Sequence, residues 1–269
     1  MHPVMTYQQF TQKRINDVLN ANAKNLKSVH NDLIKNTNTP LNSLNLFVGK
    51  KGSGKTVTAI KEIIKISENS PETHMLIYIN KTGTQHDKVF EELKHLIDIP
   101  ILYCSWQNAV EALENIFEYK KLYDSIKKNN LDNELQPNHF EELKENLYVV
   151  DTARPFLHTL IFFEDTAQSP LMKTKLIKSL LAECRHYQVS CFLPVQYWKS
   201  LDSFIKENAN KIYYFGGFPP KSFHYFLSQV PVQHDHHELL REYQKLSISD
   251  IMVVDAYSGD VLFVDREEM

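Results

Sequence analysis

The chain has 269 residues, of which 42% are hydrophobic and 23% are charged, and its formal net charge is −3. This composition excludes collagen-like, disordered and small disulfide-stapled proteins, and the length suffices for one large hydrophobic core. No apolar run approaches the roughly 18 to 20 residues that span a bilayer, so we expect no membrane span.

Charge and glycine are both unevenly distributed along the chain. Residues 1–61 contain nine Lys or Arg against two Asp, so the remainder is acidic. A basic segment of this kind is either a solvated surface or a contact for a negatively charged partner. The chain has only seven glycines, and three of them fall within six positions, at Gly49, Gly52 and Gly54.

The predicted elements divide the chain at residue 44. Residues 1–43 are polar with apolar positions at helical spacing, which predicts an N-terminal helical appendage. From there, strands and helices alternate. Strands are expected at 44–48, 74–80, 100–104, 159–163, 189–195, 211–216 and 251–256, with a hairpin turn at 257–260 into a last strand. Helices are expected at 54–68, 87–97, 107–128 and 170–187, with a polar insertion at 129–146. This alternation predicts an α/β domain over 44–269, with a mainly parallel sheet flanked by helices on both faces.

A phosphate-binding motif follows the first predicted strand. The segment GKKGSGKT fits G-x-x-x-x-G-K-[ST] and lies between a strand and a helix, as a P-loop requires. Its backbone N–H groups and the helix N-terminus favour phosphate, which predicts ATP as the cofactor. Lys55 would reach the β- and γ-phosphates and the Thr56 hydroxyl would bind Mg²⁺. The predicted nucleotide-binding residues are Gly49, Lys50, Lys51, Gly52, Ser53, Gly54, Lys55 and Thr56.

A P-loop also needs an acid at the end of a neighbouring strand to hold the metal. Three segments compete, ending at Asp151, at Glu164–Asp165 and at Asp255. The second is favoured because four large apolar residues precede two adjacent carboxylates, as in a strand buried on both faces. One carboxylate would position Mg²⁺ while the other polarises the attacking water.

Gln196 follows the predicted strand at 189–195. A Gln at the carboxyl end of a strand beside the phosphate strand can hydrogen-bond a γ-phosphate oxygen and the attacking water. Ordinary strand-end Gln residues are common, so this residue is a weaker candidate than the P-loop.

Taken in order, GKKGSGKT, TLIFFED and ECRHYQVSCFLPVQYWKSLDSFIKENANKIYYFG resemble the FtsK/HerA superfamily of DNA-pumping ATPases. Within it, the chain is most similar to the poxvirus-type genome-packaging ATPases of large DNA viruses and virophages. The resemblance covers about residues 44–257. Its specific part is Arg-His before a strand that ends in Gln, followed by Ile-Lys-Glu-Asn-Ala.

The resemblance implies a RecA/FtsK-HerA-like P-loop NTPase that hydrolyses ATP and translocates double-stranded viral DNA into a preformed capsid. It implies a homo-oligomeric ring, contact with DNA without sequence preference, and capsid proteins as partners. Glu164 and Asp165 would be the Walker B pair and Gln196 the sensor. The family more often has Asp first in this pair, so either residue could be the catalytic base.

Ring motors supply a cation in trans to the γ-phosphate, usually Arg. Arg185, before the sensor strand, is the favoured candidate, and Arg154 is the second. Lys206, where relatives often have Arg, and Arg241 are further alternatives. Alternatively, Arg185 has a structural role as a cation at a helix C-terminus, where it offsets the helix macrodipole.

Three other functions stay open at this point. They are a morphogenesis ATPase that acts on protein or membrane assemblies, a small-molecule kinase, and a nucleotide-binding assembly factor that does not hydrolyse ATP. The resemblance to viral packaging ATPases implies a location in the host cytoplasm at the assembly site, or in the virion. Three cysteines without a C-x-x-C pair agree with a reducing compartment.

Overall fold

The computed structural model describes residues 41–70, 73–83, 88–114, 117 and 158–264. Its strands are β1 (Leu44–Val48), β2 (Thr73–Asn80), β3 (Ile101–Ser105), β4 (His158–Phe163), β5 (Val189–Val195), β6 (Lys211–Phe215), β7 (Ile251–Asp255) and β8 (Val261–Val264). Its α-helices are α3 (Lys55–Asn69), α4 (Lys88–Leu93), α7 (Lys175–Ala182), α8 (Cys184–Tyr187), α9 (Ser203–Glu207), α10 (Pro220–Leu227) and α11 (His236–Tyr243). Short 3₁₀ turns lie at Lys94–Leu96, Pro170–Lys173 and Trp198–Ser200.

The strands form one eight-stranded sheet in the order β3-β2-β4-β5-β1-β6-β7-β8. All pairings from β3 to β6 are parallel, whereas β7 and β8 add an antiparallel hairpin at one side. The central strands β1, β4 and β5 are buried along their whole length, as strands covered on both faces should be. The predicted mainly parallel α/β sheet is therefore confirmed.

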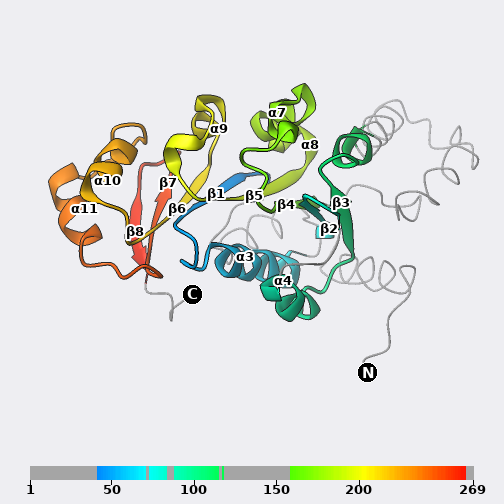
Figure 1. The fold of residues 1–269 in the computed structure, drawn as a ribbon, viewed down its shortest axis with the longest axis horizontal. Coiled ribbons are helices and arrows are strands. Elements are labelled where there is room, and N and C mark those ends of the chain that lie inside the picture. The colour runs from blue at the N-terminus through cyan, green and yellow to red at the C-terminus, as the bar shows by residue number, and fades with distance from the viewer. Residues whose placement is uncertain (1–40, 71–72, 84–87, 115–116, 118–157, 265–269) are drawn as a thin grey trace, which may run out of the picture.

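Helices cover both faces of this sheet (Figure 1). On one face lie α3 and α4, and on the other α7, α9, α10 and α11 follow one another across the sheet. Each face has its own buried apolar cluster. Ile60 and Phe90 belong to the cluster under α3 and α4. Leu180, Phe223 and Leu239 belong to the cluster under α7, α10 and α11.

Several predicted boundaries are wrong, each for a local reason. The third strand begins at Ile101 and not at 100, because Pro100 has no N–H and contributes only its carbonyl, which accepts the Leu76 N–H at 2.9 Å. The predicted helix at 170–187 is three pieces. Thr174 has an extended backbone and caps α7, accepting the Ile177 N–H at 3.4 Å. A second break falls at Glu183, which follows α7 and directly precedes α8.

Other predictions fall partly or wholly outside the described residues. The predicted helix at 87–97 ends at Leu93 and continues as a 3₁₀ turn. Of the predicted helix at 107–128, residues 109–114 and 117 are helical. Most of the N-terminal appendage and the insertion at 129–146 lie outside the described part of the chain. The hairpin at 257–260 is confirmed, and Asp255 accepts the N–H groups of Tyr257 and Ser258, both at 2.9 Å.

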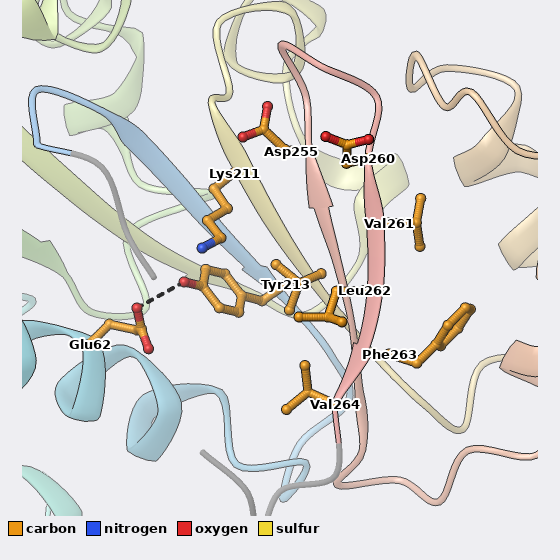
Figure 2. Close-up of a pocket in the computed structure, with 10 residues that line it drawn as sticks. Glu62, Lys211, Tyr213, Asp255, Asp260, Val261, Leu262, Phe263 and Val264 are labelled. Atoms are coloured by element: carbon orange, nitrogen blue, oxygen red, sulfur yellow. Dashed lines mark hydrogen bonds between the residues drawn. The ribbon is translucent and has the colours of Figure 1, made fainter. Parts of the chain in front are cut away.

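A buried polar contact ties α3 to β6 (Figure 2). The Glu62 side chain is fully buried, and one of its oxygens accepts the Tyr213 hydroxyl at 3.0 Å while the other lies 3.1 Å from Lys65 Nζ. Beside this contact is a cavity of about 460 Å³ against β6, β7 and β8. Lys211 also lines the cavity, and burial lowers the pKa of its ammonium group, although Glu62 and Asp255 oppose this shift.

Replacing Tyr213 with Phe should lower the free energy of unfolding by about 1 to 3 kcal/mol, because a buried carboxylate loses one of its hydrogen-bond donors. Urea denaturation of the purified protein measures this change. Tyr197→Phe is the matched control, since Tyr197 is 55% exposed and should change stability by less than about 0.5 kcal/mol. Equal stability of the two variants would contradict the structural role given to the Glu62–Tyr213 contact.

Candidate nucleotide-binding site

The predicted P-loop starts where β1 ends, in the middle of the sheet. The Gly49 N–H donates to the Val195 carbonyl of β5 at 3.1 Å, and Val48 is in register with Val195. Gln196 directly follows Val195, so the sensor candidate and the start of the P-loop lie side by side. Since β4, β5 and β1 are parallel neighbours, their carboxyl ends lie at the same edge of the sheet, and Glu164 directly follows β4 there.

The loop has the conformation that the motif requires. Gly54, which precedes α3, has φ 93° and ψ 12°, a left-handed conformation that favours glycine. At Gly49, a Cβ atom would lie 2.4 Å from Ser53 Oγ and 2.9 Å from Phe215 Cβ. The loop backbone therefore packs against β6 too closely for any side chain. Ser53 is buried, whereas Lys51 and Gly52 are exposed at the tip.

The N-terminus of α3 is suited to an anion. This helix is 15 residues long, begins at Lys55 and has no acidic residue in its first turn. Its free N–H groups and dipole favour phosphate at this end. Thr56 is the second residue of the helix and is only partly buried. The loop, the helix end and the Thr56 hydroxyl thus fit a nucleoside triphosphate with Mg²⁺.

Lys55, the first residue of α3, contacts the P-loop backbone and is influenced by the charge of Asp165. Its Nζ donates to the Lys50 carbonyl at 2.8 Å, which curls the side chain back over the loop. Burial lowers the pKa of the Lys55 ammonium, and the negative charge of Asp165 opposes this shift. The negative charge of Asp165, which follows β4, therefore favours the charged form of Lys55.

The two carboxylates of the acid pair have different surroundings. Asp165 is exposed and has a left-handed backbone with φ 48°. Glu164 is half-buried, its N–H donates to the Ile79 carbonyl at 2.8 Å, and its Oε2 accepts the Tyr78 hydroxyl. The charge of Asp165 thus acts on the P-loop lysine, and Glu164 is held against β2.

The structure also separates the competing acids. Asp255 ends β7, which is antiparallel to β6, and it is in register with Lys211 at the start of β6. Asp255 therefore lies at the opposite edge of the sheet from the P-loop. Asp151 lies outside the described residues. Within the described part of the chain, Glu164 and Asp165 are the acids of these three segments that reach the P-loop edge.

The cationic candidates have different positions in the described part of the chain. Arg185 is exposed on α8, which precedes β5, so it lies at the amino end of that strand, away from the P-loop of the same chain. Arg241 is exposed on α11. Lys206 Nζ donates to Gln229 Oε1 at 3.2 Å. Arg154 lies outside the described residues. A role for Arg185 in trans stays a prediction.

Two features of the P-loop edge of the sheet were not predicted from the sequence. Tyr78, which contacts Glu164, looks like an ordinary core residue in an apolar strand. The loop after β6 is held by Tyr243, which donates to the Phe215 carbonyl at 2.9 Å and accepts the Phe218 N–H at 3.1 Å. This places the Phe218 ring 5.8 Å from Lys50 Nζ. Neither Tyr78 nor Tyr243 belongs to a short motif, and only the strand order brings them to the site.

Comparisons with known proteins bear on the fold. No protein-family model matches the chain, and no curated protein does. Among solved structures, the DNA-packaging ATPase of Sulfolobus Turreted Icosahedral Virus matches with a TM-score of 0.52 and 13% identity, over 83% of this chain and 97% of that one. The genome packaging NTPase of Sulfolobus turreted icosahedral virus 2, in complex with AMPPCP, matches with a TM-score of 0.50 and 13% identity, over 83% and 97% of the two chains.

A third solved structure comes from a different process. The cytoplasmic domain of the Thermomonospora curvata Type VII Secretion ATPase EccC matches with a TM-score of 0.51 and 13% identity, over 84% of this chain and 26% of that one. The chain has the P-loop NTPase fold. At this identity, the similarity establishes the fold and leaves activity to the site.

Replacing Gly49 with Ala should weaken binding of a non-hydrolysable ATP analogue by about tenfold or more, because the new methyl group would collide with Ser53 Oγ and Phe215 Cβ and displace the loop backbone. Equilibrium binding of a fluorescent analogue measures this loss. Gly259→Ala is the control, since its Cβ would lie 2.9 Å from Gln233 Cγ in a distant hairpin. The control should lose stability and keep its affinity for nucleotide. A loss of affinity in both variants would contradict a local effect at the P-loop.

Proposed function

We propose that this protein is an ATP-hydrolysing motor that translocates double-stranded viral DNA into a preformed capsid. One observation carries the ATPase part, namely the convergence of the P-loop, the Glu164–Asp165 pair and Gln196 at one edge of the sheet. The DNA part is supported by the sequence resemblance to packaging ATPases and by the structural similarity to proteins described as genome-packaging NTPases.

Each residue has a definite task in this proposal. The P-loop N–H groups and Lys55 hold the β- and γ-phosphates, while Thr56 and the acid pair hold Mg²⁺. When bound, Mg²⁺ neutralises charge on the phosphate oxygens. A carboxylate of the pair orients the attacking water and accepts its proton. The exposed Gln196 amide donates to a γ-phosphate oxygen and accepts from the same water.

The position of Arg185 suits a ring-shaped homo-oligomer. It lies at the sheet edge opposite the P-loop of its own chain, so it can serve only the nucleotide of a neighbouring subunit. An Arg there would stabilise the negative charge that develops on the γ-phosphate. Capsid proteins as partners, and a location in the host cytoplasm at the assembly site or in the virion, belong to the same proposal.

A motor that moves proteins is the second candidate function, because the EccC secretion ATPase shares the fold to a similar degree. Within the described residues, no helix is both long enough and apolar enough to cross a bilayer. The two candidates differ in their response to DNA. Contact with DNA phosphates makes DNA stimulation sensitive to salt and insensitive to sequence.

Duplex DNA should raise the ATPase rate of the wild-type protein at low salt, and the increase should shrink as salt is added. Lys55→Ala should abolish hydrolysis with and without DNA, because the phosphates lose their cation. Lys245→Ala is the control, since this lysine is 68% exposed and pairs only with Glu242 in the described structure. A phosphate-release assay, alongside the oligomeric state with nucleotide, measures these outcomes. A hydrolysis rate indifferent to DNA would contradict the translocase and favour the protein-moving motor.

Glu164→Gln and Asp165→Asn should each reduce hydrolysis by about 100-fold or more while leaving nucleotide binding largely intact, because the residues act on the water and the metal and not on the phosphate cradle. Single-turnover kinetics and analogue binding separate the two effects. An assembly factor that only binds nucleotide would fill capsids equally well with both substitutions combined. A kinase would instead transfer phosphate to a nucleoside in a substrate screen.

A further inference from the structure

The Glu164 carboxylate is held by a tyrosine that no motif identifies. Tyr78 lies in β2, is fully buried, and donates its hydroxyl hydrogen to Glu164 Oε2. Its ring packs on Phe90, with ring centroids 4.0 Å apart, and on Phe162 at 5.4 Å. The hydroxyl is therefore carried to the acid by a ring that is itself tightly packed.

Strand pairing explains why this tyrosine reaches this acid. β2 pairs with β4 in parallel, and Tyr78 is in register with Phe162. Side chains two residues apart share a face of a strand, so Glu164 projects from the same side as Phe162 at the end of β4. The Glu164 N–H also donates to the carbonyl of Ile79, the neighbour of Tyr78, at 2.8 Å. β2 thus holds Glu164 by both its backbone and its side chain.

We propose that Tyr78 is a positioning residue for ATP hydrolysis, which fixes the Glu164 carboxylate in the orientation that the metal and the attacking water require. This inference rests on the proposed ATPase function and assigns a new residue to it. Tyr78 does not touch the nucleotide and acts through Glu164.

A free Glu side chain has several rotamers, and only some point a carboxylate oxygen at the reacting groups. A donor that is rigid in the core removes this freedom before substrate binds, at little entropic cost. Asp165 is exposed and has no such donor within the described residues, and its shorter side chain relies on the left-handed backbone for its direction. The two acids are therefore oriented by different means, one by a side-chain partner and the other by its backbone.

If Tyr78 had a purely structural role, that role would belong to its ring, because the ring also fills the core beside α4. Tyr78→Phe separates the two roles, since it keeps the ring and deletes only the hydroxyl. Tyr103 offers a matched control. It lies in the same aromatic cluster, with its ring centroid 5.6 Å from that of Tyr78, and the two residues are in register across β2 and β3.

Tyr78→Phe should lower the kcat of ATP hydrolysis by about 10- to 100-fold, which is the usual effect of removing a residue that orients a metal or catalytic ligand. Its KM and its affinity for a non-hydrolysable ATP analogue should stay within about twofold of the wild-type values. Tyr103→Phe should change kcat by less than about twofold. Circular dichroism and urea denaturation of both variants establish that they are folded to the same extent at the assay temperature.

A double-mutant cycle tests whether Tyr78 acts through Glu164. In a Glu164→Ala background, Tyr78→Phe should reduce the residual single-turnover rate by less than about twofold. An equal loss in both backgrounds would show that the hydroxyl acts elsewhere or through stability, and would overturn the inference. A Tyr78→Phe variant with wild-type kcat would overturn it as well. If Tyr78→Phe loses stability, the same cycle still decides, because a loss of stability lowers the rate in both backgrounds.

The outcome for the proposed function is separate. A wild-type rate no higher than that of Lys55→Ala overturns the ATPase proposal and this inference with it. An active wild-type enzyme with an unaffected Tyr78→Phe variant overturns only the role of Tyr78.

Discussion

The parallel pairing of β1 with β5, and of β5 with β4, is the constraint on which the site depends. Parallel strands that are in register end at the same edge, so the residues that follow them are neighbours in space, although Gly49 is more than a hundred positions from Glu164 and from Gln196 in the chain. The hydrogen bond from the Gly49 N–H to the Val195 carbonyl extends this pairing by one residue into the P-loop. The loop is thereby attached to the strand that carries Gln196.

The core on each face of the sheet supports this edge. On the α3 face, Glu62 ties the P-loop helix to Tyr213 of β6, so the helix N-terminus is fixed relative to the strand beside the loop. On the other face, the Tyr243 and Phe223 rings stack with centroids 3.9 Å apart, and the Tyr243 hydroxyl holds the turn after β6. Rigid elements on both sides therefore limit how far the loop can move, which is what a phosphate cradle needs.

Two opposing effects act on the charge of Lys55 in the site. Burial lowers the pKa of Lys55, and the charge of Asp165 works against this effect. Asp165, which follows β4, thus favours the charged form of Lys55 that binds phosphate. The second acid, Glu164, is directed towards β2 by Tyr78, so the adjacent carboxylates are kept in separate environments. Separate environments allow two chemically similar groups to take different roles.

Local patterns were sufficient for most of the fold. The strands at 44–48 and 189–195 were predicted with their observed bounds, because buried parallel strands are short apolar runs bounded by turn residues. The helix at 170–187 was predicted as one piece, since its apolar spacing continues across the breaks. The caps at Thr174 and Glu183 depend on backbone conformations that hydrophobic periodicity does not encode.

The sequence by itself determined the P-loop, the α/β class and the favoured acid pair, because each depends on residue types at fixed spacing within a short segment. Only the tertiary structure decided which groups meet. Because β7 is antiparallel to β6, Asp255 lies at the sheet edge opposite the P-loop. Arg185 lies away from the P-loop of its own chain, and Tyr78 contacts Glu164. The physical reason is that these relations follow from strand order and direction, which are set by the packing of the whole sheet and leave no mark in any one segment.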